Sequence, residues 1–187
     1  MASVNGIANR ALQRLGAARI SDITDATNKS ARACNAAYEP TRLMLLRQHP
    51  WSFSIKRAQL AASITAPPFD YVNYFPWPTD ALRILPPTEY GLDWQMEGRN
   101  IVTNFVAPLN VRYVADVVDP NAMDSLFREV LSAQIAYDIC DEITQSNTKK
   151  QLMRDDRDLL IATAKNTNAI EKLSDEIPDD TWLTVRL

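Results

Sequence analysis

The stretch LLRQHPWSFSIKRAQL, residues 45–60, decides the fold because two different periodicities meet within it. Before Pro50 the apolar residues follow a helical spacing, and after it Trp51, Phe53 and Ile55 alternate with polar residues. Alternation with a period of two predicts a strand with one buried face. We therefore expect a helix that ends before Pro50 and passes directly into a strand, with Pro50, Trp51, Phe53 and Ile55 as a structural junction.

The same stretch contains the only histidine of the chain, His49. A nucleophilic triad requires an imidazole within hydrogen-bond reach of a serine or cysteine, so His49 is the one candidate base. A histidine that ends a helix also interacts favourably with the last carbonyls and the helix dipole. Because the sequence has no nucleophile elbow, P-loop, HExxH or dinucleotide-binding motif, we interpret His49 as a helix end and predict no catalytic residue, metal or cofactor.

Upstream of the junction the sequence predicts two helices. Apolar residues recur every three or four positions between Ser3, a suitable N-cap, and Gly16, a suitable stop. Thr27 or Asn28 can cap the second helix, and Pro40 inside it is expected to kink it or divide it in two. The apolar face of the second helix consists of Ala31, Cys34, Tyr38, Thr41 and Leu45.

Residues 51–118 consist of short β-type runs separated by proline pairs or by EGRN, where Gly98 suits a hairpin turn. They predict a small antiparallel β lobe. Within it, YVNYFPWP contains an aromatic group that forms either an interface or the core and rim of the lobe. The candidate interface aromatics are Tyr71, Tyr74, Phe75 and Trp77.

Two further helices follow the β-type runs. Asp119 is a suitable N-cap, with Pro120 at the first helical position, for a helix whose apolar residues repeat every four positions from Phe127 to Ile143. Thr148 and Gln151 fit a capping box for the last helix. Its apolar stripe is expected to contain Leu152, Leu159, Ala162, Ala169 and Leu173. The short connection predicts an antiparallel hairpin of the two helices.

Together these elements predict an α+β fold that is mainly α. A bundle of about four helices, residues 1–50 and 119–173, carries the inserted β lobe 51–118 and an extended C-terminal arm, 174–187. The arm has acidic residues followed by apolar ones, and it either folds back onto the bundle or docks on a neighbouring subunit or partner. Its apolar residues are Ile177, Trp182, Leu183, Val185 and Leu187.

Composition restricts the function further. A net charge of -3 gives no global cationic field, which disfavours a nucleic-acid binder that relies on counterion release. No apolar run is long enough to cross a bilayer and no signal-peptide pattern opens the chain, so we expect a protein of the cytosol. Cys34 and Cys140 lack metal or redox spacing and predict two buried thiols.

Five segments, in order, resemble the tail tubular protein A family of short-tailed bacteriophages, the head-to-tail connector or adaptor proteins. They are ANRALQRLG (8–16), ARISDITDATNKSARACNAAYEPTRLMLLRQHPWSFSIKRAQLA (18–61), EGRNIVTN (97–104), APLNVRYVADVVDP (107–120) and ITQSNTKKQLM (143–153). The most specific piece is the junction at Pro50 and Trp51 with its trailing Lys56-Arg57-Ala58. The resemblance covers nearly the whole chain.

The resemblance implies a structural virion protein rather than an enzyme. Twelve copies would form a ring beneath the portal protein and extend the channel for DNA ejection, through which double-stranded DNA passes without sequence-specific binding. Tail nozzle and tail fibre proteins would attach to this ring, and no membrane would be involved. The protein would be made in the host cytoplasm and reside in the tail or neck of the virion. The C-terminal arm would bind the portal through Ile177, Trp182, Leu183, Val185 and Leu187.

Two alternatives stay open from the sequence. One is a connector or head-completion protein of a long-tailed phage, which also uses a ring of helical bundles. The other is a cell-wall hydrolase, which would need two carboxylates facing each other across a cleft of about 5 to 10 Å. The acidic clusters lie instead on the polar sides of predicted helices, at Asp138, Asp141 and Glu142 and at Asp155, Asp156 and Asp158.

Overall fold

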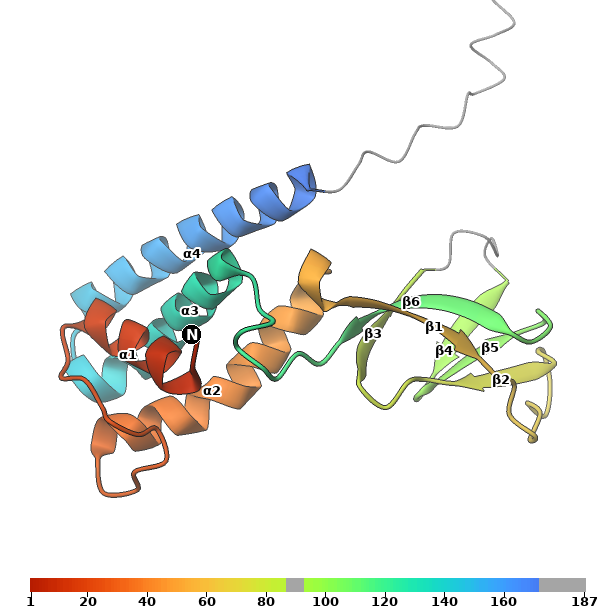
Figure 1. Cartoon of the computed structure of the whole chain (residues 1–187), viewed down its shortest axis with the longest axis horizontal. Coiled ribbons are helices and arrows are strands. Elements are labelled where there is room, and N and C mark those ends of the chain that lie inside the picture. Colours follow the sequence, from red (N-terminus) through yellow and green to blue (C-terminus); the bar gives the residue numbers. More distant parts are fainter. Residues whose placement is uncertain (87–92, 172–187) are drawn as a thin grey trace, which may run out of the picture.

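The structure, a computed structural model, describes residues 1–86 and 93–171. Within these ranges the molecule is elongated, with the helices at one end and the strands at the other (Figure 1). The helices are α1 (Val4–Leu15), α2 (Lys29–Gln48), α3 (Ser125–Thr144), α4 (Asn147–Ile170) and the short 3-10 helix η1 (Ser52–Ser54). The strands are β1 (Ile55–Leu60), β2 (Asn73–Pro76), β3 (Ala81–Leu85), β4 (Trp94–Glu97), β5 (Asn100–Thr103) and β6 (Leu109–Ala115).

The first two helices begin where the sequence predicts. The Ser3 hydroxyl accepts a hydrogen bond from the Gly6 amide, and Gly16 ends α1 with a φ of 72°. Asn28 caps α2 by accepting from the amides of Ser30 and Ala31. Of the two effects expected at Pro40, a kink or a division, the division is wrong, because α2 is continuous to Gln48. Pro40 and Ala36, whose carbonyl would otherwise pair with residue 40, are both exposed, so water can satisfy that carbonyl.

The starts of the last two helices differ from the prediction. Asp119 accepts a bond from the Asn121 amide in a turn, and α3 begins later, where the Asp124 carboxylate accepts from the amides of Leu126 and Phe127. Similarly, α4 is capped by Ser146 instead of Thr148. In both cases two residues within a short segment could cap the helix, and the sequence pattern did not distinguish them.

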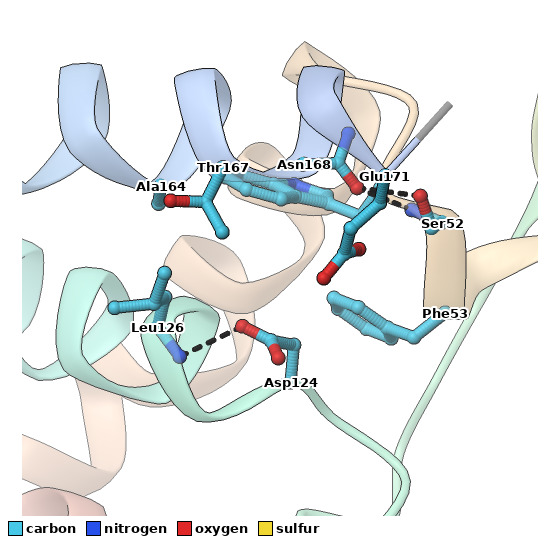
Figure 2. A pocket seen from close by; sticks show the side chains of 9 residues that line it. Ser52, Phe53, Asp124, Leu126, Ala164, Thr167, Asn168 and Glu171 are labelled. Carbon is cyan, nitrogen blue, oxygen red and sulfur yellow. Dashed lines mark hydrogen bonds between the residues drawn. The ribbon is translucent and has the colours of Figure 1, made fainter. Parts of the chain in front are cut away.

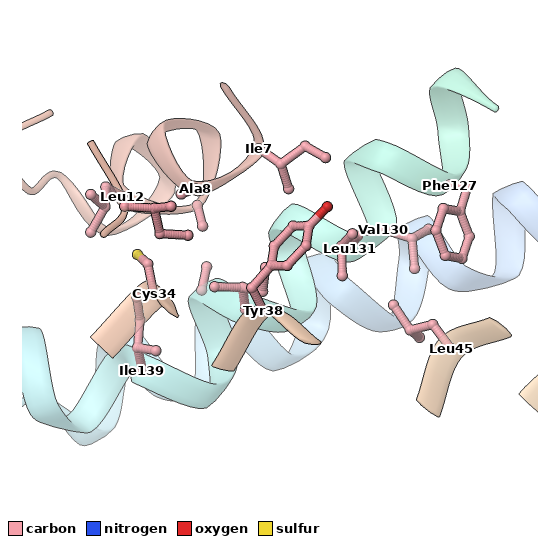
Figure 3. Close-up of a cluster of buried hydrophobic side chains, with 14 of the residues drawn as sticks. Ile7, Ala8, Leu12, Cys34, Tyr38, Leu45, Phe127, Val130, Leu131 and Ile139 are labelled. Atoms are coloured by element: carbon pink, nitrogen blue, oxygen red, sulfur yellow. The ribbon is translucent and has the colours of Figure 1, made fainter. Parts of the chain in front are cut away.

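A hydrophobic core lies between α1, α2 and α3, and α4 covers α3 as the predicted antiparallel hairpin (Figure 3). The expected apolar face of α2 is buried, and Cys34 and Cys140 are free and buried. The expected stripe of α4 is wrong. Leu152 and Leu159 are exposed, and α4 packs through Met153, Leu160, Ile161, Ala164 and Asn168.

The strands form two antiparallel sheets of three strands each, with the orders β1-β6-β3 and β2-β5-β4. The predicted hairpin at Gly98 joins β4 to β5, and Gly98 has the positive φ of 59° that such a turn requires. A second core is built from both sheets and is centred on Phe75, Ile84, Ile101 and Val111.

The predicted fold of a mainly helical bundle with one small β lobe is therefore wrong. Across the described residues the chain is an α+β fold of four helices and two three-stranded antiparallel sheets. The β region is too large for a lobe, since it has two layers and buries its own aromatic and aliphatic side chains. Among the described residues, no helix combines the length and apolar character that crossing a bilayer requires.

Candidate functional site: the junction and the exposed apolar surfaces

The helical and β regions meet at the junction of Pro50, Trp51, Phe53 and Ile55. The expected direct passage from helix to strand is wrong, because η1 (Ser52–Ser54) lies between α2 and β1. The Ser54 amide and hydroxyl both donate to the Trp51 carbonyl, at 2.9 and 2.8 Å, which closes this turn. The chain therefore changes direction at Trp51, and β1 begins only at Ile55.

Trp51 is the centre of the junction. Its side chain is 3% exposed, and its indole Nε1 donates to the Leu45 carbonyl in the last turn of α2 at 3.0 Å. The ring stacks on Phe53 and meets Phe127 of α3 edge to face, with centroids 6.5 and 5.3 Å apart. One side chain thus joins the end of α2, the turn and the start of α3.

Asn168, in the last turn of α4, fixes the junction from the other side. Its Oδ1 accepts from the Ser52 amide at 2.8 Å and from the Ser52 hydroxyl at 2.7 Å. Its Nδ2 lies 2.9 Å from His49 Nε2 and also donates to the Pro50 carbonyl at 3.4 Å. Since an amide nitrogen can only donate, His49 Nε2 accepts this bond. A single buried amide therefore connects α4 to His49, Pro50 and Ser52.

A pocket of about 90 Å³ lies between the junction, the start of α3 and the end of α4 (Figure 2). Phe53 and the carboxylates of Asp124 and Glu171 face one another across it. Asp124 is engaged as the N-cap of α3. The pocket is lined by Trp51, Ser52, Phe53, Asp124, Leu126, Ala164, Thr167, Asn168 and Glu171.

The structure places His49 at the C-cap of α2, in edge-to-face contact with Trp51 at 4.7 Å. Its Nε2 is bonded to an amide instead of a serine or cysteine. This is the geometry of a residue that ends a helix. In the described part of the chain, no group of three or more His, Cys, Asp or Glu residues could hold a metal ion.

The acidic clusters that a hydrolase would need are engaged in structural contacts. Asp156 of α4 pairs with Arg14 of α1, which also contacts Glu129 of α3 at 2.6 Å. Asp138 accepts from Thr41 of α2. Asp141 of α3 pairs with Lys150 of α4. Within α4, Asp158 pairs with Arg157, and Asp155 accepts from Gln151. Asp138, Asp141 and Asp156 thus join helices, and none of these carboxylates lines the pocket.

A second link between the regions passes through Arg42 of α2. Its guanidinium is buried, pairs with Asp116 just after β6, and donates to the Val117 carbonyl at 2.9 Å. On the core side of the adjoining sheet, Asp80 accepts from Lys56 at 2.8 Å and from the Tyr113 hydroxyl at 3.1 Å. The hydrogen bond from Lys56 is the main cause that lowers the pKa of the Asp80 carboxyl. The contacts of Arg42 thus join the helical and β regions by an ion pair and a hydrogen bond, in addition to the covalent chain.

The aromatic group of YVNYFPWP is divided between core and surface. Phe75 is fully buried in the second core, so it is not an interface residue of the folded subunit. Tyr71, Tyr74 and Trp77 are half-buried. The Arg99 guanidinium lies over the Trp77 ring at 5.5 Å, which is a cation–π distance. The predicted arm residues Ile177, Trp182, Leu183, Val185 and Leu187 lie outside the described residues.

Two exposed apolar surfaces stand out. The outer stripe consists of Leu152, Leu159 and Ile170 of α4, which are 57%, 67% and 85% exposed. These positions share one side of the helix because seven and eighteen residues are close to whole numbers of turns. The distal tip lies at the end of the β region away from the helices (Figure 1). It consists of Ile64, Phe69, Val72 and Val106, which are all exposed.

The distal tip is formed by two loops that hydrogen bonds hold side by side. The Val72 amide donates to Asn104 Oδ1 at 3.2 Å, and Asn73 Nδ2 donates to the Phe105 carbonyl at 2.9 Å. Neither surface was predicted from the sequence. Apolar residues in loops give no periodic signal, and Leu152 and Leu159 of α4 were assigned to its buried face. Asn168 was missed for a different reason, because a lone polar residue on a helix carries no pattern.

No protein-family model matches the chain, and no curated protein matches it either.

Proposed function

We propose that this chain is a structural subunit of a virion, a head-to-tail adaptor of which twelve copies form a ring beneath the portal protein. The ring would extend the DNA channel and bind the tail nozzle and fibres. The family resemblance of the sequence suggests this role. The role is mechanical, and it calls for broad surfaces and a rigid subunit instead of a catalytic centre.

The observation that carries the proposal is the outer stripe of α4. Leu152 and Ile170 are eighteen residues apart, so the stripe extends about 27 Å along the helix. An isolated subunit leaves these side chains in water although the opposite side of α4 is packed on α3. Three large apolar side chains aligned on one side of a helix are the kind of surface that a neighbouring subunit can bury. In a closed ring each subunit would bury the stripe against its neighbour.

The two ends of the molecule support the same role. The distal tip places a second apolar surface at the far end of the β region, where a further component can bind without disturbing the outer stripe. Between these surfaces, Trp51, Asn168 and the Arg42–Asp116 pair hold the two regions together. An adaptor that connects a head to a tail needs such a fixed relation between its binding surfaces.

Substitution within the outer stripe tests the proposal. Leu159→Lys places a charge in the middle of the stripe and is expected to abolish incorporation into portal-bound rings, measured by co-sedimentation of the full chain with portal. Ala169→Lys is the matched control, since Ala169 is also exposed on α4 but projects about 100° away from Ile170. Unchanged incorporation of the Leu159→Lys variant would contradict the role of the stripe.

The C-terminal arm is a separate part of the proposal. Deletion of residues 177–187 is expected to leave a folded subunit, because the four helices and two sheets of the described residues form two cores of their own. The truncated chain should lose binding to the portal in the same sedimentation assay. Undiminished binding would show that the portal is recognised elsewhere.

A further inference from the structure

Three arginines share one face of the β1-β6-β3 sheet. Arg57 of β1 lies directly opposite Arg112 of β6, and Arg83 of β3 lies opposite Val114, two residues further along β6. Residues that face each other across antiparallel strands project from the same side, as do residues two apart on one strand. Arg57, Arg83 and Arg112 therefore form one group, here named the arginine face.

In the described part of the chain, no acidic side chain pairs with the arginine face. Among the described residues none of its guanidinium groups forms an ion pair or a side-chain hydrogen bond. The direct opposition of Arg57 and Arg112 is itself unfavourable, since like charges in register destabilise a strand pair. By contrast, Lys56 on the other side of β1 is paired with Asp80, and the buried Arg42 is paired with Asp116. Such a concentration of positive charge in a chain of net charge -3 indicates a site for an anionic partner.

One end of the arginine face borders the helical core. Val114, opposite Arg83, is part of the helical core, and Leu85, opposite Arg112, packs against that core. Asn168 in the last turn of α4 is bonded to Ser52, which precedes Arg57 by five residues. At the rise of a strand those five residues span at most about 17 Å. An extended segment of six residues after Glu171 covers a similar length, about 20 Å.

The sequence that follows α4 has the opposite charge. Asp175, Glu176, Asp179 and Asp180 lie within six residues, and only three residues separate Glu171 from the first of them. Arginine and carboxylate groups form bidentate hydrogen-bonded pairs, which are among the strongest polar contacts. We infer that this acidic segment, residues 175–180, docks on the arginine face of its own chain. Docking there would set the direction in which the apolar residues 182–187 leave the subunit, whatever partner they bind.

A spin label on the full chain tests this inference. A nitroxide is attached to a cysteine introduced by Thr181→Cys. Labelling is selective because Cys34 and Cys140 are buried, and burial raises the pKa of the Cys34 thiol to about 11. Amide signals of β1 and β6 near Arg57 and Arg112 should be lost through paramagnetic broadening, while those of α1 are retained. The Arg57→Gln/Arg112→Gln double variant should recover them, whereas Arg19→Gln, at an exposed arginine in the α1–α2 connection, should not.

Each other outcome counts against the inference. Broadening that is absent, or that persists unchanged in the double variant, would overturn it. Broadening seen only when spin-labelled chain is mixed with isotope-labelled chain would assign the arginine face to a second copy instead. Binding of duplex DNA that shifts the Arg57 and Arg112 signals, with no broadening from the label, would assign it to nucleic acid. In the expected case the broadening weakens as added salt screens the charges.

Discussion

Trp51→Ala is the most informative single substitution because Trp51 contacts three elements at once. The indole is 3% exposed, and truncating a buried tryptophan to alanine costs about 3 to 5 kcal/mol. The substitution also removes the donor that satisfies the Leu45 carbonyl in the last turn of α2. We therefore expect a loss of about 4 kcal/mol or more, a large fraction of the roughly 5 to 15 kcal/mol by which a typical domain is stable.

Urea unfolding followed by far-ultraviolet circular dichroism measures this loss in free energy of unfolding. Trp51→Phe keeps an aromatic ring but removes the hydrogen bond from Nε1, so it should cost distinctly less than the alanine variant. His49→Ala is the second control, because His49 ends α2 and is only half-buried. It should leave assembly largely intact. A loss below about 2 kcal/mol for Trp51→Ala would refute the central position of this residue.

Two further predictions concern polar groups. Asn168→Leu removes the acceptor of the Ser52 amide. It is expected to lower the free energy of unfolding, measured by urea titration, by about 2 kcal/mol. A variant as stable as the native chain would show that Asn168 does not stabilise the junction. The hydrogen bond from Lys56 is the main reason that the pKa of Asp80 is lower in the folded protein than in the unfolded chain, where it is about 4. The ionised Asp80 carboxylate therefore stabilises the fold fully above about pH 4. This contribution is lost as the pH falls through the lower, folded-state pKa. The stability difference between the native chain and Asp80→Asn should therefore be largest near neutral pH and shrink in acid, and a difference independent of pH would contradict this linkage.

Helical periodicity located the four helices but could not assign the faces of α4. Its sequence carries two apolar sets, one with Leu152 and Leu159 and one with Leu160 and Ile161. The structure buries the second set against α3 and exposes the first. Periodicity alone cannot decide between two such sets, because the choice depends on the surface that α3 offers. Leu152 and Leu159, which the sequence assigned to the core, belong to the surface that we propose for the subunit interface.

At the junction, the sequence predicted the position of the turn but not its conformation. Alternating Trp51, Phe53 and Ile55 is the pattern of a strand, yet Trp51 and Phe53 stack on each other within a 3-10 turn and both contact Phe127. The position of the junction was predictable from Pro50, but its conformation depends on a side chain more than seventy residues away. Asn168 lies further still along the chain, and its contact with Ser52 has no signature in either segment.

The size of the β region was underestimated because its strands are short and separated by irregular segments. Each run alone predicts an edge or hairpin strand, and the pairing of β6 between β1 and β3 joins segments far apart in sequence. Phe75, considered for an interface, is buried because β2 pairs with β5 and places it opposite Ile101 in the second core.

Electron microscopy of the full chain mixed with portal protein tests the proposed function most directly. We predict a second ring of twelvefold symmetry beneath the portal, in which α4 of each subunit faces its neighbour and buries Leu152, Leu159 and Ile170. Portal particles without a second ring, or a ring in which the outer stripe of α4 faces solvent, would contradict it.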